Sequence, residues 1–409
     1  MHRTEGANNL AGMFTDGPPG TTVEEDWLNA IQEEIIAVLT AAGISPLTAI
    51  TDTRVQLLAA LQTLFVEPDE GIGKNAIING AMRIAQRGAS GTAAFTAATT
   101  PANSDDTYLL DRWLLLSDGN DIVDVTQSTE APTGGLLSCA LDVETINKKF
   151  GILQVIEQKN CAHMIGGNAS LSFYAKVSDV SKLDNIKAMV VSWDGAADTV
   201  TSDIVSAWNV EDTTPTLVAN WTAENVPANL GITAAWAKYT IPNIAIDTAS
   251  TKNIGVFIWS DGFCDTVAKF LYITNVQLEK NAVASEYEWR NIQTELALCE
   301  RYYCKSYDQI TIPGAITDTG IVWIDSDGHS NVDHTVTTTI KFLVSMRTTP
   351  TITLYDAVGA SGKVTMIAGD GIVGAVNFQG AMGFSVGGTN GAASTIRRLK
   401  AHYVSEIEL

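Results

Sequence analysis

Side chains that could hold a metal ion are few and scattered. The sequence has five histidines, and none has the HxH or HExxH spacing of a zinc site. Two acidic stretches, from Asp118 to Asp124 and from Asp325 to Asp333, carry the hard oxygen donors that suit Ca²⁺. The second lacks the third acid and the closing Glu of an EF-hand loop, so a polar turn is the favoured interpretation there. For the first stretch, a solvated turn and a Ca²⁺ site explain the residues about equally well. We expect no metal site and no cofactor, with Ca²⁺ at either stretch left open.

Signatures of covalent catalysis are missing from the sequence. There is no Gly-x-Ser-x-Gly elbow around a serine, and no recognisable pairing of a cysteine with a histidine. The segment Gly71-Ile-Gly73-Lys74 has neither the spacing nor the hydroxyl residue of a phosphate-binding loop. Glycoside hydrolysis needs two carboxylates, and among 46 acidic residues chance supplies many pairs. We expect a protein that is not an enzyme.

Tryptophan is the residue type that points most directly to a ligand. The chain has nine, and five lie in one β-rich stretch: Trp193, Trp208, Trp221, Trp236 and Trp259. An indole that faces solvent can stack on the C–H face of a sugar or on another apolar ligand, whereas a buried indole only fills a core. Trp208 and Trp221 have polar, loop-like neighbours. These two are therefore the candidate ligand-binding side chains.

The composition excludes several classes of protein. The formal net charge is −21, which opposes a nucleic-acid partner because phosphate binding needs a basic surface. No apolar segment is long enough to span a bilayer, and the first residues lack the apolar core of a secretory signal. The five cysteines form no CxxC pair and are odd in number, which favours reduced thiols over a disulfide framework. We expect synthesis in a cytoplasm and no membrane insertion.

The N-terminal region is predicted to be an arm followed by two short helices. Residues 1–21 are rich in Gly, Pro, Asn and Thr. Thr22 and Glu25 have the spacing of a capping box, and Gly43 can end the helix that they begin. A second amphipathic segment runs from about residue 52 to 65. The apolar side of the first helix, which needs a partner surface, contains Trp27, Leu28, Ile31, Ile35, Val38 and Ala42.

The rest of the chain is predicted to be mainly β. Short β-branched and aromatic runs at 171–177, 187–193, 253–259 and 270–278 are separated by polar turns, as in a jelly-roll β-sandwich. Helical spacing returns at 292–303, and further β-runs follow to the C-terminus. The Gly-rich stretch 380–391 is interpreted as a long loop at a tip. We expect an attachment region at 1–67, a sandwich at 68–291 and a C-terminal β tip domain at 292–409.

A set of segments spread along the sequence is typical of one family: Phe14 to Ile35, Asn75 to Gly88, Tyr108 to Trp113, Val276 to Arg290, Glu295 to Tyr303 and Lys341 to Pro350. Together they resemble tail-fibre and receptor-binding proteins of tailed bacteriophages. The resemblance covers nearly the whole chain in the expected order. Lys280-Asn281 stands where a glycine is common in such proteins, and Ile84-Ala85 replaces a usual aromatic residue, so the ligand-facing surface of the sandwich can differ.

This resemblance implies a homotrimer that is a component of the virion tail and is synthesised in the cytoplasm of the host bacterium. Its N-terminus would attach to other tail proteins, its middle domain would be similar to carbohydrate-binding modules, and its β-domains would bind a glycan or protein on the host cell surface. Two other functions stay open. One is a purely structural tail or adaptor protein that contacts only virion subunits, and the other is a tailspike-like glycanase. No ligand residue is carried over from the resemblance.

Overall fold

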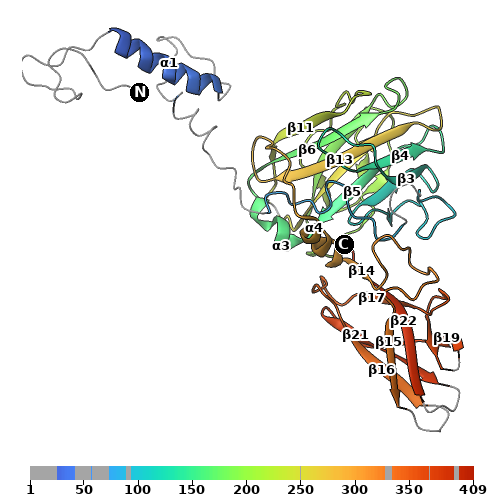
Figure 1. The fold of residues 1–409 in the computed structure, drawn as a ribbon. Coiled ribbons are helices and arrows are strands. Elements are labelled where there is room, and N and C mark those ends of the chain that lie inside the picture. Colours follow the sequence, from blue (N-terminus) through green and yellow to red (C-terminus); the bar gives the residue numbers. More distant parts are fainter. Residues whose placement is uncertain are drawn as a thin grey trace, which may run out of the picture. The chain divides into compact units, whose positions relative to one another are not determined.

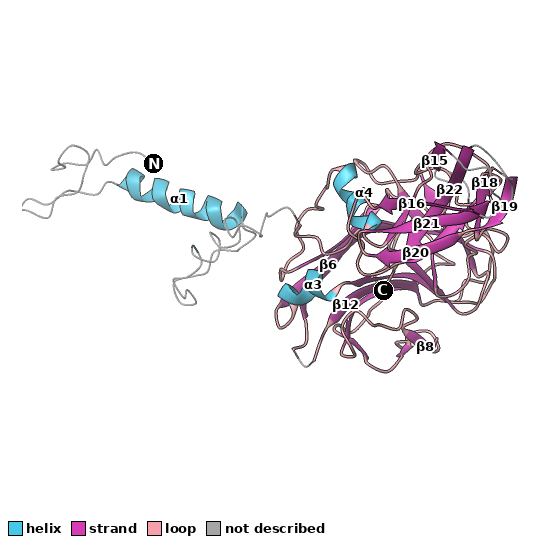
Figure 2. Cartoon of the chain, turned by 90° about the horizontal axis from the view of Figure 1, so that it is seen from below, coloured by secondary structure: helices cyan, strands magenta, loops and turns pink. Residues whose placement is uncertain are grey.

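The computed structural model describes residues 25–41, 57, 73–88, 94–248, 250–327, 334–367, 369–390 and 396–409. The chain is mainly β, as predicted, and its strands form several antiparallel sheets (Figures 1 and 2). It divides into two compact units, Met1–Gly71 and Ile72–Leu409. No helix in the described part of the chain is long and apolar enough to cross a membrane.

The first unit contains helix α1 (Glu25–Ala41). Ile31 and Val38 are half-buried, Ile35 is exposed at 36%, and the buried apolar residue is Leu39 at 4%. Leu39 was not in the predicted stripe, although it follows Ile35 by one helical turn and so shares its side of the helix. The side chains of Trp27 and Leu28, the cap at Thr22 and almost all of the predicted second helix lie outside the described residues.

The second unit contains a β-sandwich of two antiparallel sheets. The six-stranded sheet has the order β1 (Thr107–Tyr108), β2 (Leu114–Ser117), β5 (Phe150–Ile156), β12 (Asn253–Ser260), β7 (Ile186–Trp193) and β10 (Trp221–Ala223). The five-stranded sheet has the order β11 (Ala237–Ala245), β6 (Asn168–Val177), β13 (Phe270–Glu279), β4 (Ser138–Val143) and β3 (Val123–Ser128).

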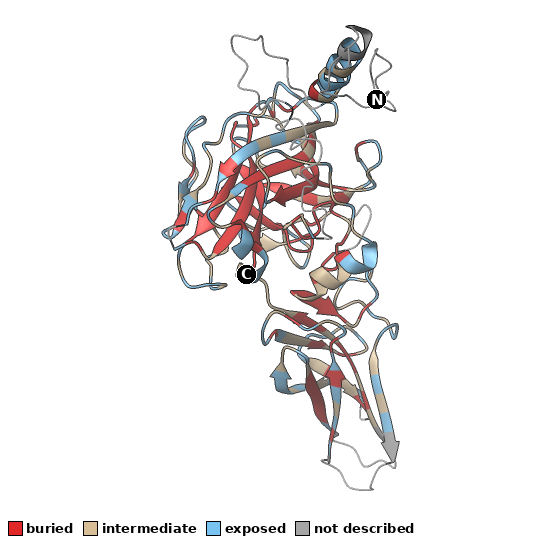
Figure 3. Ribbon diagram, turned by 90° about the vertical axis from the view of Figure 1, so that its left-hand side faces the viewer, coloured by how far each residue is buried: buried red, intermediate tan, exposed pale blue. Residues whose placement is uncertain are grey.

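The two sheets differ in how many of their faces are buried. On β13, Leu271 and Ile273 point into the core between the sheets, whereas Phe270 and Tyr272 alternate with them and are half-buried on the outer face. In the six-stranded sheet both faces are buried, and its strands are almost uninterrupted apolar runs (Figure 3). The outer face of that sheet is covered by residues of the 194–223 segment, which holds β8 (Val205–Ala207) and β9 (Thr216–Leu217), and by helix α4 (Ile292–Glu300).

A bulge in β13 keeps its second half in register with the core. The pairing with β6 shifts between Thr274 and Gln277, and Asn275 has a φ of 52°. After this extra residue, Val276 and Leu278 point into the same core as Ile273. Without the bulge, the period of two would turn the second half of the strand outward.

The C-terminal β-region is built around one long strand, β22 (Ile396–Glu406). The other strands are β14 (Tyr303–Lys305), β15 (Val322–Asp327), β17 (Thr351–Tyr355), β18 (Lys363–Met366) and β19 (Gly369–Val373), together with a separate sheet of β16 (His334–Lys341), β21 (Gly383–Asn390) and β20 (Ala375–Gly380). Strand β22 pairs with four of them, namely β14, β15, β17 and β18. Two short helical turns, α3 (Gln158–Cys161) and η1 (Ala162–Met164), follow β5 in the sandwich.

The Gly-rich stretch 380–391 is not a long loop, and that prediction is wrong. Residues 383–390 form β21, which is paired with β16 on one side and β20 on the other. Phe384 and Val386 fill the core of the C-terminal region. Gly388 is needed for close packing, because a Cβ there would lie 2.9 Å from Val364 and 3.0 Å from the sulfur of Met366. Gly388 therefore allows β21, the central strand of its sheet, to approach β18 closely, and the stretch does not form a loop at a tip.

The expected domain limits at 67/68 and 291/292 stay predictions. The structure groups residues 72–409 in a single compact unit, and Cys299, Tyr302 and Leu409 pack with sandwich residues on the outer face of the six-stranded sheet. The C-terminal β-region is therefore joined to the sandwich by shared apolar packing.

Candidate functional site

The two tryptophans singled out from the sequence lie on the covered face of the six-stranded sheet. Trp221 is only 6% exposed, its ring centroid is 5.2 Å from that of Trp193, and its Nε1 donates to Thr201 Oγ1 at 3.1 Å. The expectation that this indole faces solvent is wrong, because β10 adds to the edge of β7 with Trp221 opposite Trp193. Trp208 is half-buried, with its ring centroid 5.9 Å from that of Phe257.

The outer face of the five-stranded sheet carries a different group of aromatic side chains. Phe270 and Tyr272 are stacked, with centroids 5.6 Å apart and planes at 17°. Trp236, which directly precedes β11, meets Tyr272 edge-on at 6.2 Å. All three are half-buried. Together with Lys176 of β6 and Asp142 of β4, they are called the aromatic face below.

Lys176 gives the aromatic face a polar side. Its Nζ lies 4.8 Å from the centroid of Tyr272 and 5.5 Å from that of Trp236, within the range of a cation–π interaction. The same Nζ donates to the carboxylate of Glu130 at 2.6 Å. Burial, followed by the nearby carboxylates of Glu130 and Asp142, raises the pKa of Tyr272, so its hydroxyl is protonated at neutral pH. Apolar ring surface therefore lies directly beside hydrogen-bonding groups.

Two polar atoms at this face have no hydrogen-bond partner among the residues that the structure describes. Trp236 Nε1, a donor, and Asp142 Oδ1, an acceptor, are both buried and make no hydrogen bond. Buried polar atoms are nearly always paired, and each exception calls for an explanation such as a ligand or an ordered water. A ligand with hydroxyl groups can satisfy both, since a hydroxyl donates as well as accepts.

Acidic residues extend the aromatic face along the sheet. Asp142 pairs in register with Phe270 on one side and with Asp124 on the other. Burial, and then the charge of Glu144, raises the pKa of both Asp124 and Asp142 to about 6. Like charges opposite each other on neighbouring strands are destabilising. Here such a pair, Asp124 and Asp142, lies directly beside the aromatic rings.

The two stretches considered for Ca²⁺ make contacts with protein donors. Asn103 Nδ2 donates to Asp121 at 3.0 Å and Asp124 at 2.9 Å, and Lys148 pairs with Asp118 at 3.1 Å. Asp325 accepts two hydrogen bonds of 3.0 Å from Arg398, while residues 328–333 lie outside the described part. In the described residues, no group of three or more His, Cys, Asp or Glu side chains could hold a metal ion.

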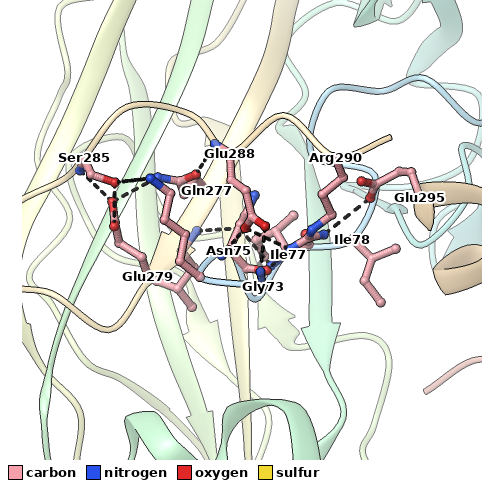
Figure 4. A network of polar contacts seen from close by, with 12 residues as sticks. Gly73, Asn75, Ile77, Ile78, Gln277, Glu279, Ser285, Glu288, Arg290 and Glu295 are labelled. Atoms are coloured by element: carbon pink, nitrogen blue, oxygen red, sulfur yellow. Dashed lines mark hydrogen bonds and ion pairs between the residues drawn. The ribbon is translucent and has the colours of Figure 1, made fainter. Parts of the chain in front are cut away.

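The segment from Val276 to Arg290, which carries part of the sequence resemblance, forms a polar clasp at one end of β13 (Figure 4). Glu288 accepts hydrogen bonds of 2.7 Å from the backbone N–H groups of Gly73 and Asn75. Arg290 donates to the carbonyl oxygens of Asn75 and Ile77. These contacts hold residues 73–77 against the sandwich.

The other half of the clasp is formed within β13 and the loop that follows it. Gln277 accepts from the N–H of Glu288 at 2.8 Å, and Glu279 accepts from the N–H and hydroxyl of Ser285 at 2.6 and 2.8 Å. Figure 4 shows these side chains in one connected network with Glu288 and Arg290. The motif is therefore structural, and it fixes the strand that presents Phe270 and Tyr272.

The aromatic face was missed in the sequence although a signal for it was present. The run 270–278 predicts a strand by alternation, and the positions that alternate with Leu271 and Ile273 are aromatic instead of polar. Large apolar residues at solvent-side positions of a sandwich strand mark an interaction surface. Trp208 and Trp221 were preferred because of their polar neighbours in sequence, which belong to a segment that covers the other sheet.

No family model and no curated protein matches the sequence. Several solved structures are similar in part. The enzymatically active domain of tailspike protein 4 from Bacteriophage CBA120 has 15% identity and a TM-score of 0.27, over 45% of this chain and 21% of that chain. A xylan-binding domain of carbohydrate-binding family 22 has 10% identity and a TM-score of 0.27, over 44% and 95%. The C-terminal family 22 carbohydrate-binding module of Clostridium thermocellum Xyn10B has 12% identity and a TM-score of 0.27, over 44% and 94%.

Proposed function

We propose that this chain is a glycan-binding protein and that the aromatic face is its binding surface. The observation that carries the proposal is the combination of three half-buried rings with an unpartnered donor, Trp236 Nε1, and an unpartnered acceptor, Asp142 Oδ1. Sugar rings present a C–H face to aromatic side chains and hydroxyl groups to polar ones, so both kinds of contact are met at once. The adjoining carboxylates favour neutral glycans over anionic ones.

More specifically, we propose that the chain is a tail-fibre component of a bacteriophage. Its support is the sequence resemblance, which runs through the chain in order from Phe14 to Pro350. In this form the protein is a trimer in the virion tail, and its N-terminal region, including the helix residues Trp27, Leu28, Ile31, Ile35 and Val38, attaches to other tail proteins. The β-regions then contact a glycan on the host cell surface, without catalysis.

A structural adaptor is the second candidate, and one observation favours it. Leu343, Phe378 and Val373 in the C-terminal β-region are exposed at 96%, 92% and 70%. Large apolar side chains in such numbers suit burial against another virion subunit. An adaptor would not need the aromatic face.

The test uses the full chain, fluorescently labelled, against a panel of bacterial strains and an array of surface glycans. We expect strain-selective binding that soluble polysaccharide competes away, and the double substitution Phe270→Ala with Tyr272→Ala should weaken it at least about tenfold, or about 1.4 kcal/mol. Trp323→Ala is the matched control, because this tryptophan is 58% exposed but lies on β15.

Binding to no strain and no glycan by a folded protein would contradict the proposal and favour the adaptor. Equal loss in the double variant and in Trp323→Ala would contradict the choice of face. Release of reducing ends from a bound polysaccharide would show that the chain is a glycanase.

A further inference from the structure

A cavity lies between the sandwich and the C-terminal β-region, and it is separate from the aromatic face. Its volume is about 380 Å³, within the range of roughly 300–1,000 Å³ typical of ligand pockets. Tyr108 and Pro101 line it from the sandwich, and Tyr303, Tyr355 and Pro313 line it from the C-terminal side. This cavity, called the junction pocket below, shares no lining residue with the aromatic face.

Arg87 also lines the junction pocket and is the most informative of its polar residues. It is only 3% exposed, and its Nη2 pairs with Glu408 at 2.7 Å and Glu406 at 2.9 Å. The guanidinium carbon lies 4.0 Å from the ring centroid of Tyr303 and 5.5 Å from that of Tyr108. Its Nη1, however, is closed off from solvent and has no acceptor within the described part of the chain. A buried N–H without an acceptor is costly, and a ligand oxygen would remove that cost.

The charges around the pocket select against an anionic ligand. Arg87 is already matched by two carboxylates, and Asp106 adds a further negative charge to the lining. An anion bound to Nη1 would therefore meet more negative than positive charge, whereas a neutral oxygen would not. An ammonium group is also unsuitable as the partner of Nη1, because it only donates hydrogen bonds and offers no acceptor. The favoured ligand is thus neutral and offers an oxygen acceptor.

The walls define the shape of that ligand. Three tyrosine rings and two prolines give flat apolar surfaces, and Thr107, Thr353 and Asp106 offer hydroxyl and carboxylate groups between them. We propose that the junction pocket binds a single neutral sugar residue with its ring against the tyrosines, and that a small shift of the buried Arg87 side chain on binding lets Nη1 donate to one sugar oxygen. This site is separate from the aromatic face and does not depend on it.

The experiment measures binding of neutral methyl glycosides to the full chain by saturation-transfer NMR and titration calorimetry, with a glucuronide and glucosamine as charged comparisons. We expect one neutral glycoside to bind saturably and the charged sugars to bind more weakly. Tyr355→Ala should weaken binding at least about tenfold, equal to about 1.4 kcal/mol. Tyr355→Phe, which keeps the ring, should retain most of it. Melting curves verify that each variant is folded.

Tyr272→Ala is the control that separates the two sites. It should leave the junction pocket intact, while Tyr355→Ala should leave polysaccharide binding by the aromatic face intact. The proposal is overturned if no neutral glycoside binds the folded wild-type chain, or if Tyr272→Ala abolishes monosaccharide binding and Tyr355→Ala does not. A crystal grown with the glycoside that shows only an ordered water on Arg87 Nη1 would also overturn it.

Discussion

Asp124 and Asp142 sit opposite each other on β3 and β4, and burial together with the charge of Glu144 raises the pKa of each carboxyl to about 6. In the unfolded chain these groups have pKa values near 3.8. Between these values the folded state binds protons that the unfolded state does not, so this pair lowers stability as pH rises from about 4 to about 6. The penalty continues to grow through the folded-state pKa and is nearly complete at about pH 7, one unit above it.

Asp142→Asn should remove most of this penalty. We expect the variant to be more stable than the wild type at about pH 7.5, with the difference shrinking as pH falls to about 5. The measurement is the free energy of unfolding in urea at several pH values. Asp325→Asn is a suitable control because its carboxyl, held by Arg398, has a lowered pKa instead. A difference between wild type and Asp142→Asn that does not change with pH would contradict the assignment.

Residue types alone do not identify the aromatic face. What marks it is that Phe270 and Tyr272 share the outer face of one strand, and this depends on the position of each residue in the strand. The sequence correctly predicts a strand at 270–278, but which of its faces stays open depends on what covers each sheet. Trp221 shows the same limit. Its polar neighbours suggested a surface loop, and only the pairing of β10 with β7 places the indole over Trp193.

At the scale of elements, close packing of β5 against β12 depends on Gly151. A Cβ at this position would lie 2.3 Å from the carbonyl oxygen of Ile258 and 2.6 Å from the Cβ of Trp259. Gly151→Ala should therefore force the two strands apart and destabilise the sandwich by about 1–3 kcal/mol, the usual cost of overpacking a core. Gly380→Ala is the matched control, since a Cβ at that position would meet nothing within 4 Å. Urea unfolding of the two variants compares them directly, and similar losses in both would contradict this account.

The sequence predicts helices and strands best where burial imposes a clear pattern of apolar residues on the element. The runs at 187–193 and 253–259 lie within β7 and β12, and the helical spacing from residue 292 corresponds to α4. The stretch 380–391 was misjudged because glycine is common both in loops and at positions where backbones approach closely. At Gly388 the second reason applies, and it becomes visible only when β18 is placed beside β21.

At the scale of the whole second unit, Glu408 links the sandwich to the C-terminal β-region. Its side chain is 7% exposed and pairs with Arg87 and Arg112, whose side chains are 3% and 1% exposed. The Arg112 guanidinium carbon lies 3.7 Å from the ring centroid of Tyr302. Burial lowers the pKa of both arginines, but Glu408 offsets this and raises each above its ordinary value, so both stay charged. The Glu408 carboxylate thus pairs with two buried cations on the sandwich, and Glu406 supplies further counter-charge to Arg87.

Glu408→Gln leaves both guanidinium groups buried with less counter-charge, and removing one partner of a buried pair costs about 3–5 kcal/mol. Glu406→Gln is the matched control, because Glu406 pairs with the same Arg87 but its side chain is 46% exposed, and an exposed partner contributes at most about 1 kcal/mol. Scanning calorimetry should show one transition for the second unit in the wild type and in Glu406→Gln. In Glu408→Gln we expect a lower melting temperature and separate unfolding of the C-terminal β-region, since its charge link to the sandwich is lost. Two separate transitions already in the wild type, unchanged by Glu408→Gln, would show that Glu408 does not couple the unfolding of the two β-regions.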